Sequence, residues 1–410
     1  MADTVYLLGA GINRVLKNDE GLQPPLATDF FQQVFKQNRH KINEYVLEEL
    51  KPLFDYIEHY WKLPIEQLKH YSFDLEAFYT LIQLQKQEAE KSNDETRLAS
   101  LYQIELQLTV LLAEYLATFD LPYNSSGSKS FSFFGSIIYE QQAVVITFNY
   151  DTLLETVISH ASGGNSKVPA TFVDVAFRRI EVTDEDVAFS HHNWNAPLGY
   201  GIEFDEVQLH RAGIPICVPG ERFYSHPSNN LYENPILKLH GSLNWFTYSG
   251  NKKPSNSWLK HYGVEANYPH DAENAKNRIG RTVLLRDSSW YGKLPEHNDE
   301  VLEPIIITPV LYKNFHQYSF INELWKRAVL ELSKCKTLVV GGYSFPPTDF
   351  NTKRLFLEAF DEHSPEDIIV INPDTSVVQT VKDLCHFKKP VLACRDLDEY
   401  IALFIGAQFF

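Results

Sequence analysis

The amino-acid sequence predicts an α/β protein whose main part is a doubly wound parallel sheet. Two observations lead to this fold class. Short, almost wholly apolar runs recur along the 410 residues, and stretches of helical periodicity separate many of them. Strands buried on both faces of a parallel sheet are apolar throughout, whereas strands with one wet face alternate. Apolar runs that alternate with helices therefore indicate a sheet with helices on both faces.

Six apolar runs are the predicted strands of this sheet, and helices are expected between and after them. The strands are predicted at 5–8, 143–148, 236–240, 305–308, 338–342 and 368–372, with a last apolar element at 391–393. Helices are predicted from about 30 to 119, at 322–333 and at 397–405. Asp29 precedes the first helix as a candidate N-cap. Residues 124–128, rich in Ser and Gly, are expected to form a surface loop.

Two long stretches interrupt the strands and differ from them in composition. Residues 30–125 are predicted to be a helical insertion. Residues 161–235 are irregular and rich in Gly, Pro, His and aromatic side chains, which predicts a mixed insertion of short strands and loops. The parallel-sheet domain then comprises residues 1–29, 126–160 and 236–410.

The charge balance argues against a nucleic-acid backbone as the main partner. The chain has 37 Lys and Arg residues against 53 Asp and Glu residues, a formal net charge of −16. A protein this acidic repels DNA and RNA phosphates through its overall field. A phosphorylated small molecule is still compatible, because oriented backbone amides at a helix N-terminus bind phosphate locally.

The four cysteines do not form a metal or redox motif. Cys217, Cys335, Cys385 and Cys394 include no Cys-x-x-Cys pair, so neither a zinc ribbon nor a redox dithiol is expected, and we predict no metal site. We expect buried, reduced thiols rather than a bond between Cys385 and Cys394.

The sequence also bears on where the protein works. The first residues lack a basic region followed by a long apolar stretch, and no apolar run approaches membrane-spanning length. A soluble cytoplasmic protein without membrane attachment is predicted.

Glycine-rich and polar turns follow several of the predicted strands. They are Gly9-Ala10-Gly11 with Asn13, Gly341-Gly342 with Ser344, and Asn372 with Asp374. Ligands of open parallel sheets bind beside the carboxyl ends of the strands, where glycines let the backbone approach phosphate. These turns together favour a nucleotide site. The full Gly-x-Gly-x-x-Gly pattern is absent because position 14 is Arg14, which argues against an ordinary hydride-transferring dehydrogenase.

Asn149 and His240 are the candidate reactive residues. They lie in Thr147-Phe148-Asn149-Tyr150-Asp151 and Lys238-Leu239-His240-Gly241-Ser242, each just after an apolar run. Carboxyl ends of parallel strands share one side of a sheet, so the two side chains could meet there. An amide can hold a water and an imidazole can take its proton, which suits the cleavage of a glycosidic bond. The residues alone leave open a packed histidine, a turn asparagine and a helix-capping role for Asp151.

The ordered set of turns resembles the sirtuin NAD-binding fold, specifically its bacterial sirtuin-like NAD-hydrolase branch. The matching segments are Gly9-Ala10-Gly11-Ile12-Asn13, Asp29-Phe30-Phe31, Thr147 to Asp151, His240-Gly241, the run 342–349 and Ile371-Asn372. The chain departs from protein-deacylating sirtuins at three points. It lacks their four zinc cysteines, Phe31 stands where they have Arg, and Phe148 stands where they have Gln. The resemblance therefore implies an NAD-binding Rossmann-like fold without the acyl-lysine groove.

The resemblance also implies an activity and a set of site residues. It implies an NAD+ glycohydrolase with Asn149 and His240 as catalytic residues. The implied NAD contacts are Gly9, Ala10, Gly11, Asn13, Asp29, Phe30, Thr147, Asp151, Gly341, Gly342, Ser344, Asn372 and Asp374. The alternatives are ADP-ribosyl transfer by the same residues and an NAD-derived nucleotide sensor without turnover.

Members of this branch resemble antiphage defence effectors, in which loss of NAD halts the infected cell. Such an enzyme must be held inactive until it is triggered. The resemblance therefore implies a homo-oligomer, or a partner ATPase or nucleic-acid-guided protein encoded nearby.

Overall fold

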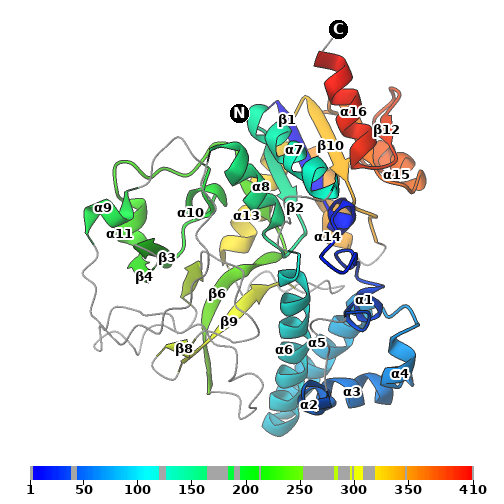
Figure 1. The fold of residues 1–410 in the computed structure, drawn as a ribbon, viewed down its shortest axis with the longest axis vertical. Helices are drawn as coiled ribbons and strands as arrows, with labels where there is room; N and C mark the ends of the chain where they lie inside the picture. Colours follow the sequence, from blue (N-terminus) through cyan, green and yellow to red (C-terminus); the bar gives the residue numbers. More distant parts are fainter. Residues whose placement is uncertain are drawn as a thin grey trace.

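The computed structural model describes most of the chain and contains two sheets. The described residues are 3–37, 44–119, 126–163, 183–188, 194–211, 214–252, 281–284, 296–297, 300–307, 319–346 and 349–408. One sheet is parallel throughout and the other is mixed, and a group of helices lies beside them (Figure 1).

The parallel sheet has six strands, and its order reverses in the middle. The strands are β1 (Thr4–Leu8), β2 (Val144–Thr147), β5 (Ile236–Lys238), β10 (Thr337–Gly341), β11 (Asp367–Ile371) and β12 (Leu392–Cys394). Their order in space is β12-β11-β10-β1-β2-β5, and every neighbouring pair is parallel. Counted along the chain, this is the order 3-2-1-4-5-6 of dinucleotide-binding folds, with its switch point between β1 and β10. The predicted fold class is confirmed.

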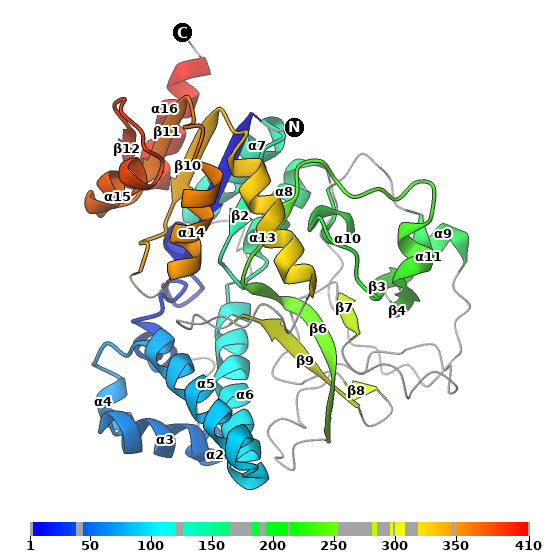
Figure 2. The ribbon, with the colours of Figure 1, turned by 180° about the vertical axis from the view of Figure 1, so that it is seen from behind.

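Helices cover both faces of this sheet, as the apolar strands require. Figure 1 shows α7 (Ser126–Glu140) and α8 (Leu153–Ala161) in front of it, and α16 (Leu397–Gln408) contacts α7. From behind, α13 (Ser319–Leu332) and α14 (Phe350–Ala359) lie in front of it (Figure 2). The side chains of β2 and β5 are all buried, which explains why these strands carry no alternating polar residues.

The start of α7 differs from the sequence prediction. Residues 126–128, expected in a surface loop, form the first turn of α7. Gly127 serves close packing there, because a Cβ on it would lie 1.9 Å from the carbonyl oxygen of Val15. The glycine of this Ser- and Gly-rich stretch therefore reflects close packing of α7 against Val15. Residues 124 and 125 lie outside the described residues.

A group of helices follows the first strand and lies on the lower side of the molecule in Figures 1 and 2. It contains α1 (Phe30–Val34), α2 (Glu44–Glu49), α3 (Lys51–Trp61), α4 (Ile65–Leu68), α5 (Leu75–Ser92) and α6 (Glu95–Ala117). Asp74 and Asp94 cap α5 and α6 through their side chains. Lys86 and Glu105 join these two helices by a 2.7 Å ion pair.

The second sheet combines strands from two separate stretches of the chain. Its order is β4-β3-β7-β6-β9-β8, formed by β3 (Glu206–Arg211), β4 (Ile214–Pro219), β6 (Gly241–Lys252), β7 (Thr282–Leu284), β8 (Glu296–His297) and β9 (Glu300–Ile306). It therefore takes β3 and β4 from the predicted mixed insertion, and it takes β6, β7, β8 and β9 from residues that the sequence assigned to the parallel-sheet domain. The short helices α9 (Asp184–Val187), α10 (Ala196–Gly199) and α11 (Gly220–Tyr224) accompany it.

One predicted strand of the parallel sheet belongs to this second sheet. Ile305 and Ile306 end β9, which pairs antiparallel with β6, with Ile306 opposite Gly241. The prediction was wrong because an apolar run shows that a strand is buried but not which sheet buries it. Residue 308 lies outside the described part of the chain.

The core includes a large aromatic cluster and buried thiols. Trp245 is fully buried against Tyr200 and Phe204. Cys335, Cys385 and Cys394 are buried free thiols, as expected.

Among the helices of the described residues, none is long and apolar enough to cross a membrane.

Candidate functional site

The site predicted at the strand ends is built around two glycine turns that touch each other. Gly9 follows β1 and donates its N–H to Gly341 at the end of β10 (2.9 Å), and Gly11 donates to Gly342 (2.9 Å). A Cβ on Gly9 would lie 2.8 Å from the carbonyl oxygen of Gly342. Gly342 has φ +62°, and a Cβ on it would lie 1.9 Å from the backbone nitrogen of Ile12. Only glycine permits this backbone contact at the switch point.

Asn13 connects the first turn to the loop after β2. It lies in a short 3-10 helix, η1 (Ala10–Val15), and is buried. Its Nδ2 donates to Oδ2 of Asp151 at 2.8 Å. Ala10 is exposed at the start of the same helix. The loops after β1 and β2 are thus fixed to each other.

Asn149 and His240 follow neighbouring strands at equal positions. Thr147 of β2 pairs with Lys238 of β5, and Leu239 donates its N–H to the carbonyl oxygen of Thr147 at 3.0 Å. Asn149 and His240 each lie two residues beyond this pair. The structure therefore brings both residues to the carboxyl ends of adjacent strands. Adjacent strands are about 4.8 Å apart.

Asn149 and Thr147 also contact the end of β1. The Nδ2 of Asn149 donates to the carbonyl oxygen of Gly9 at 3.3 Å. The hydroxyl of Thr147 donates to the carbonyl oxygen of Leu8 at 3.1 Å and accepts the N–H of Asn149 at 3.1 Å. The Thr147 hydroxyl therefore fixes the backbone that carries Asn149.

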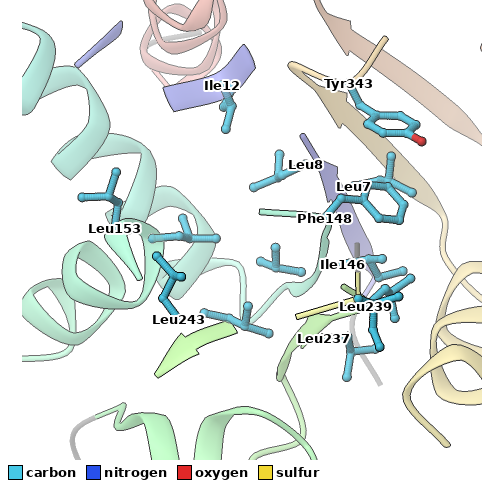
Figure 3. Packing of buried hydrophobic residues seen from close by; sticks show 14 of the residues in the cluster. Leu7, Leu8, Ile12, Ile146, Phe148, Leu153, Leu237, Leu239, Leu243 and Tyr343 are labelled. Atoms are coloured by element: carbon cyan, nitrogen blue, oxygen red, sulfur yellow. The ribbon is translucent and has the colours of Figure 1, made fainter. Parts of the chain in front are cut away.

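His240 is packed among aromatic rings. Its side chain is buried, with a ring-centroid distance of 4.9 Å to Phe148 and longer distances of 6.3 and 6.4 Å to Tyr150 and Trp325. Figure 3 shows Phe148 beside Tyr343 above the apolar side chains of the strands; their ring centroids are 4.6 Å apart. Nε2 of His240 lies 4.0 Å from Oδ2 of Asp349.

Asp151 combines a contact at a helix start with the contact to Asn13. Its Oδ1 accepts the N–H of Leu153 at 3.2 Å, at the first residue of α8. Burial raises the pKa of this carboxyl above its ordinary value, Glu155 raises it further, and Lys238 opposes the change. The sequence left open whether Asp151 caps a helix or contacts a ligand. Its position at the start of α8 is compatible with both roles.

Lys238 is a buried lysine that sequence reasoning did not single out. Its ammonium donates to Oε1 of Glu155 at 2.7 Å and to the carbonyl oxygen of Asp151. Tyr200 donates to the same Glu155 oxygen at 3.0 Å. Lys238 thereby joins the Asn149-containing segment to the His240-containing segment through their backbones and side chains.

The third group of predicted residues supports the turn after β10. Asn372 donates its Nδ2 to the carbonyl oxygen of Tyr343 at 3.0 Å and accepts the N–H of Asp374 at 2.9 Å. Asp374 is exposed and accepts the N–H of Ser376 at 2.9 Å; bonds from Ser376 lower the pKa of its carboxyl. Ser344 is exposed.

Asp29 and Phe30 are engaged in other contacts. Asp29 forms a 2.7 Å ion pair with Arg14 and accepts the N–H of Leu26 at 2.7 Å; it makes no side-chain cap bond to α1. Phe30 is 1% exposed and packs against Phe31 and Tyr115. Asp29 thus holds the loop after η1, and Phe30 anchors the helical group.

Asp349 is a second residue of this region to which the sequence assigned no role. It follows the turn after β10 and caps α14 through its side chain. The signal available in the sequence was an Asp directly before a helical pattern. That signal predicts a cap, but the approach to His240 depends on the fold. Among the described residues, no group of three or more potential ligand side chains could hold a metal ion.

The chain matches no family model and no curated protein. Among solved structures, it is similar to a Sir2 homologue solved as a complex with NAD, with 12% identity over 98% of this chain and 88% of the other and a TM-score of 0.38. It is similar also to a Sir2 enzyme structure that addresses mechanism and regulation, with 10% identity, 100% and 94% coverage and a TM-score of 0.37. Scores this low carry no argument about activity.

Proposed function

We propose that this protein is an NAD+ glycohydrolase that cleaves the nicotinamide–ribose bond to give ADP-ribose and nicotinamide. One observation supports it most. A sheet of order 3-2-1-4-5-6 has Asn149 and His240 at the ends of adjacent strands, and Asn149 donates to Gly9 in one of the two glycine turns of the switch point. Folds of this order bind dinucleotides at that switch point.

The glycine turns support the binding part of the proposal. Dinucleotide-binding folds hold the pyrophosphate beside glycine turns at the switch point. The turns at Gly9–Gly11 and Gly341–Gly342 stand at that point, where their glycines also allow the two turns to contact each other. Asn13, Asp151 and Asn372 stand at the ends of three strands as hydrogen-bonding groups for ribose hydroxyls. Ser344 is exposed on the turn after β10 and is proposed to contact the same ligand.

The chemistry proposed for Asn149 and His240 follows from the bond that breaks. Nicotinamide is cationic in NAD+ and leaves as a neutral base, so the transition state is an oxocarbenium-like ribose. The Asn149 amide orients the attacking water or a ribose hydroxyl without adding charge. When water attacks, its O–H bond breaks as the imidazole of His240 takes the proton, and the oxygen uses that electron pair to bond to the anomeric carbon of the ribose. The electrons of the broken C–N bond leave with nicotinamide and neutralise its positive charge.

The experiment is an NAD-consumption assay on the purified protein with chromatographic detection of products. We expect nicotinamide and ADP-ribose from the parent, and a loss of about 100-fold or more in Asn149→Ala and His240→Ala. His59→Ala, a change in an exposed histidine of α3, is the matched control and should retain the parent rate. Chemical denaturation verifies that each variant is folded. If both site variants consume NAD like the parent, the proposed site is wrong.

The same assay separates the alternatives. ADP-ribosyl transfer gives nicotinamide without an equal amount of free ADP-ribose. A sensor binds NAD in calorimetry but yields no product at saturating NAD.

We further propose a role in antiphage defence, and this rests only on the family resemblance described from the sequence. In that role the enzyme stays inactive in the cytoplasm until infection, held by homo-oligomerisation or by a partner ATPase or nucleic-acid-guided protein. Phage challenge of cells carrying the parent or His240→Ala tests the role. Loss of protection with loss of NAD depletion is expected in the variant.

A further inference from the structure

Asp349 and His240 approach each other from different parts of the fold. His240 follows β5, whereas Asp349 lies at the start of α14, after β10. Oδ2 of Asp349 is 4.0 Å from Nε2 of His240, and both side chains are buried, with residue exposures of 6% and 5%. Two ionisable groups at this distance, away from water, interact strongly whenever both carry charge.

The Asp349 carboxylate is held rigidly. Its Oδ2 accepts hydrogen bonds from the hydroxyls of Tyr343 at 2.6 Å and Thr352 at 2.7 Å, and its Oδ1 accepts the N–H of Thr352 at 3.3 Å. These donors and the N-terminus of α14 stabilise the ionised form of a carboxylate. The group is therefore a fixed negative charge rather than a mobile surface acid.

Among the described residues, the other groups that pack around His240 are neutral or paired. Phe148 and Trp325 contact the ring without carrying charge. Burial raises the pKa of Tyr150 and Tyr343 well above the ordinary value, so both phenols are protonated at neutral pH. Lys238, on the strand before His240, is paired with Glu155.

We propose that Asp349 is the positioning residue of His240, whose carboxylate orients the imidazole and stabilises its protonated form. This inference rests on the proposed function, in which His240 takes a proton from water or a ribose hydroxyl. The imidazole becomes a cation at that step, and the fixed charge of Asp349 balances it without itself accepting the proton. Release of the proton to solvent then restores neutral His240.

The test begins with a variant that preserves the helix cap. Asp349→Asn removes the charge, while an Asn side chain caps helices about as well as Asp does. Asp74→Asn is the matched control, because Asp74 also caps a helix, α5, by accepting the N–H groups of Glu76 and Ala77. Denaturation curves of both variants establish that each is folded.

The decisive readout is the protonation of His240 itself, followed by NMR of the full-length protein labelled with ¹³C at the histidine Cε1. The His240 signal is identified by its loss in His240→Gln. We expect this signal to titrate at lower pH in Asp349→Asn than in the parent and in Asp74→Asn. An unchanged titration in Asp349→Asn would overturn the proposal. This readout needs no turnover, so it holds even if the protein proves not to consume NAD.

The kinetic readout connects the pair to turnover. In Asp349→Asn we expect kcat for NAD consumption to fall about tenfold, a part of the 10²–10⁴-fold range of general acid–base catalysis, with KM little changed. The acidic limb of the kcat profile should move to lower pH together with the NMR titration. A lower kcat with an unmoved acidic limb would assign Asp349 a structural role only.

Discussion

The partly buried carboxylate of Asp151 connects the loop after β1 with the loop after β2. It accepts from Asn13 and from the first N–H of α8, and its pKa is raised by burial. Lys238 lies close enough to oppose that change and binds the backbone of the same residue. A charge kept here is costly to the folded state, although water reaches part of the side chain and reduces the cost.

The pH dependence of stability follows from this environment. A carboxyl whose pKa is raised in the folded protein costs stability as pH rises from its unfolded value through the raised one. Asp151→Asn removes that cost, since the amide oxygen still accepts from Asn13 or Leu153. We expect Asp151→Asn to become more stable relative to the parent between about pH 3 and about pH 7. Urea denaturation at both pH values measures it.

Asp374→Asn is the control with the opposite sign. Hydrogen bonds from Ser376 lower the pKa of Asp374, so this carboxylate contributes stability above its unfolded pKa and loses it as pH falls. Asp374→Asn should therefore become less stable relative to its parent over the same rise in pH. If the relative stability of both variants changed in the same direction with pH, the opposite pKa shifts of Asp151 and Asp374 would be contradicted.

At the scale of elements, the turn that follows β10 is constrained by β1 and η1, which pack against it. Gly341 and Gly342 are adjacent, but their surroundings differ. A Cβ on Gly342 would meet the backbone of Ile12 and Gly11, whereas a Cβ on Gly341 would meet only side-chain methyls of Leu8 and Ile12, at 3.0 and 3.1 Å. The φ of +62° at Gly342 adds strain for any L side chain.

The two glycines therefore form a matched pair of substitutions. We expect Gly342→Ala to lower the free energy of unfolding by about 3 kcal/mol, from backbone overlap and left-handed strain together. Gly341→Ala should cost about 1 kcal/mol, because the methyl ends of the two neighbours can shift. Guanidinium denaturation measures both, and similar costs at the two positions would exclude the close approach of the two turns.

At the scale of the whole molecule, three thiols are buried in the part of the parallel-sheet region that contains β10, β11 and β12. Cys335 precedes β10, Cys385 follows α15 (Ser376–Leu384), and Cys394 ends β12. Burial raises the pKa of Cys335 to about 12 and that of Cys394 to about 11. Both reduced access and a low thiolate fraction make these cysteines unreactive in the folded state.

Thiol labelling consequently reports the local unfolding of the region around β10, β11 and β12. We expect maleimide to label Cys335, Cys385 and Cys394 at neutral pH at least about 10³-fold more slowly in the native protein than in denaturant. Peptide mass mapping separates them from Cys217. Rapid native labelling of Cys335 would contradict the burial of the strand that it precedes.

Much of the parallel sheet was predictable because its signals are local. Continuous apolar runs such as Val144–Thr147 reflect burial on both faces, and the glycines at 9, 11, 341 and 342 reflect turns that exclude side chains. The same locality explains the failure at 305–307. Its apolar side chains show burial, but the strand pairs with β6 of the mixed sheet rather than with β5 or β12, the edge strands of the parallel sheet.

The sequence by itself determined which segments are buried strands, which turns consist of glycine and where Asn149 and His240 stand at strand ends. Only the tertiary structure decided the strand order, with β1 beside β10, and the distant contacts of the site. Those contacts are the ion pair of Lys238 with Glu155 and the approach of Asp349 to His240. The reason is physical: burial and backbone conformation depend on neighbouring residues in the chain, whereas pairing of strands and charges depends on long-range packing of the whole chain.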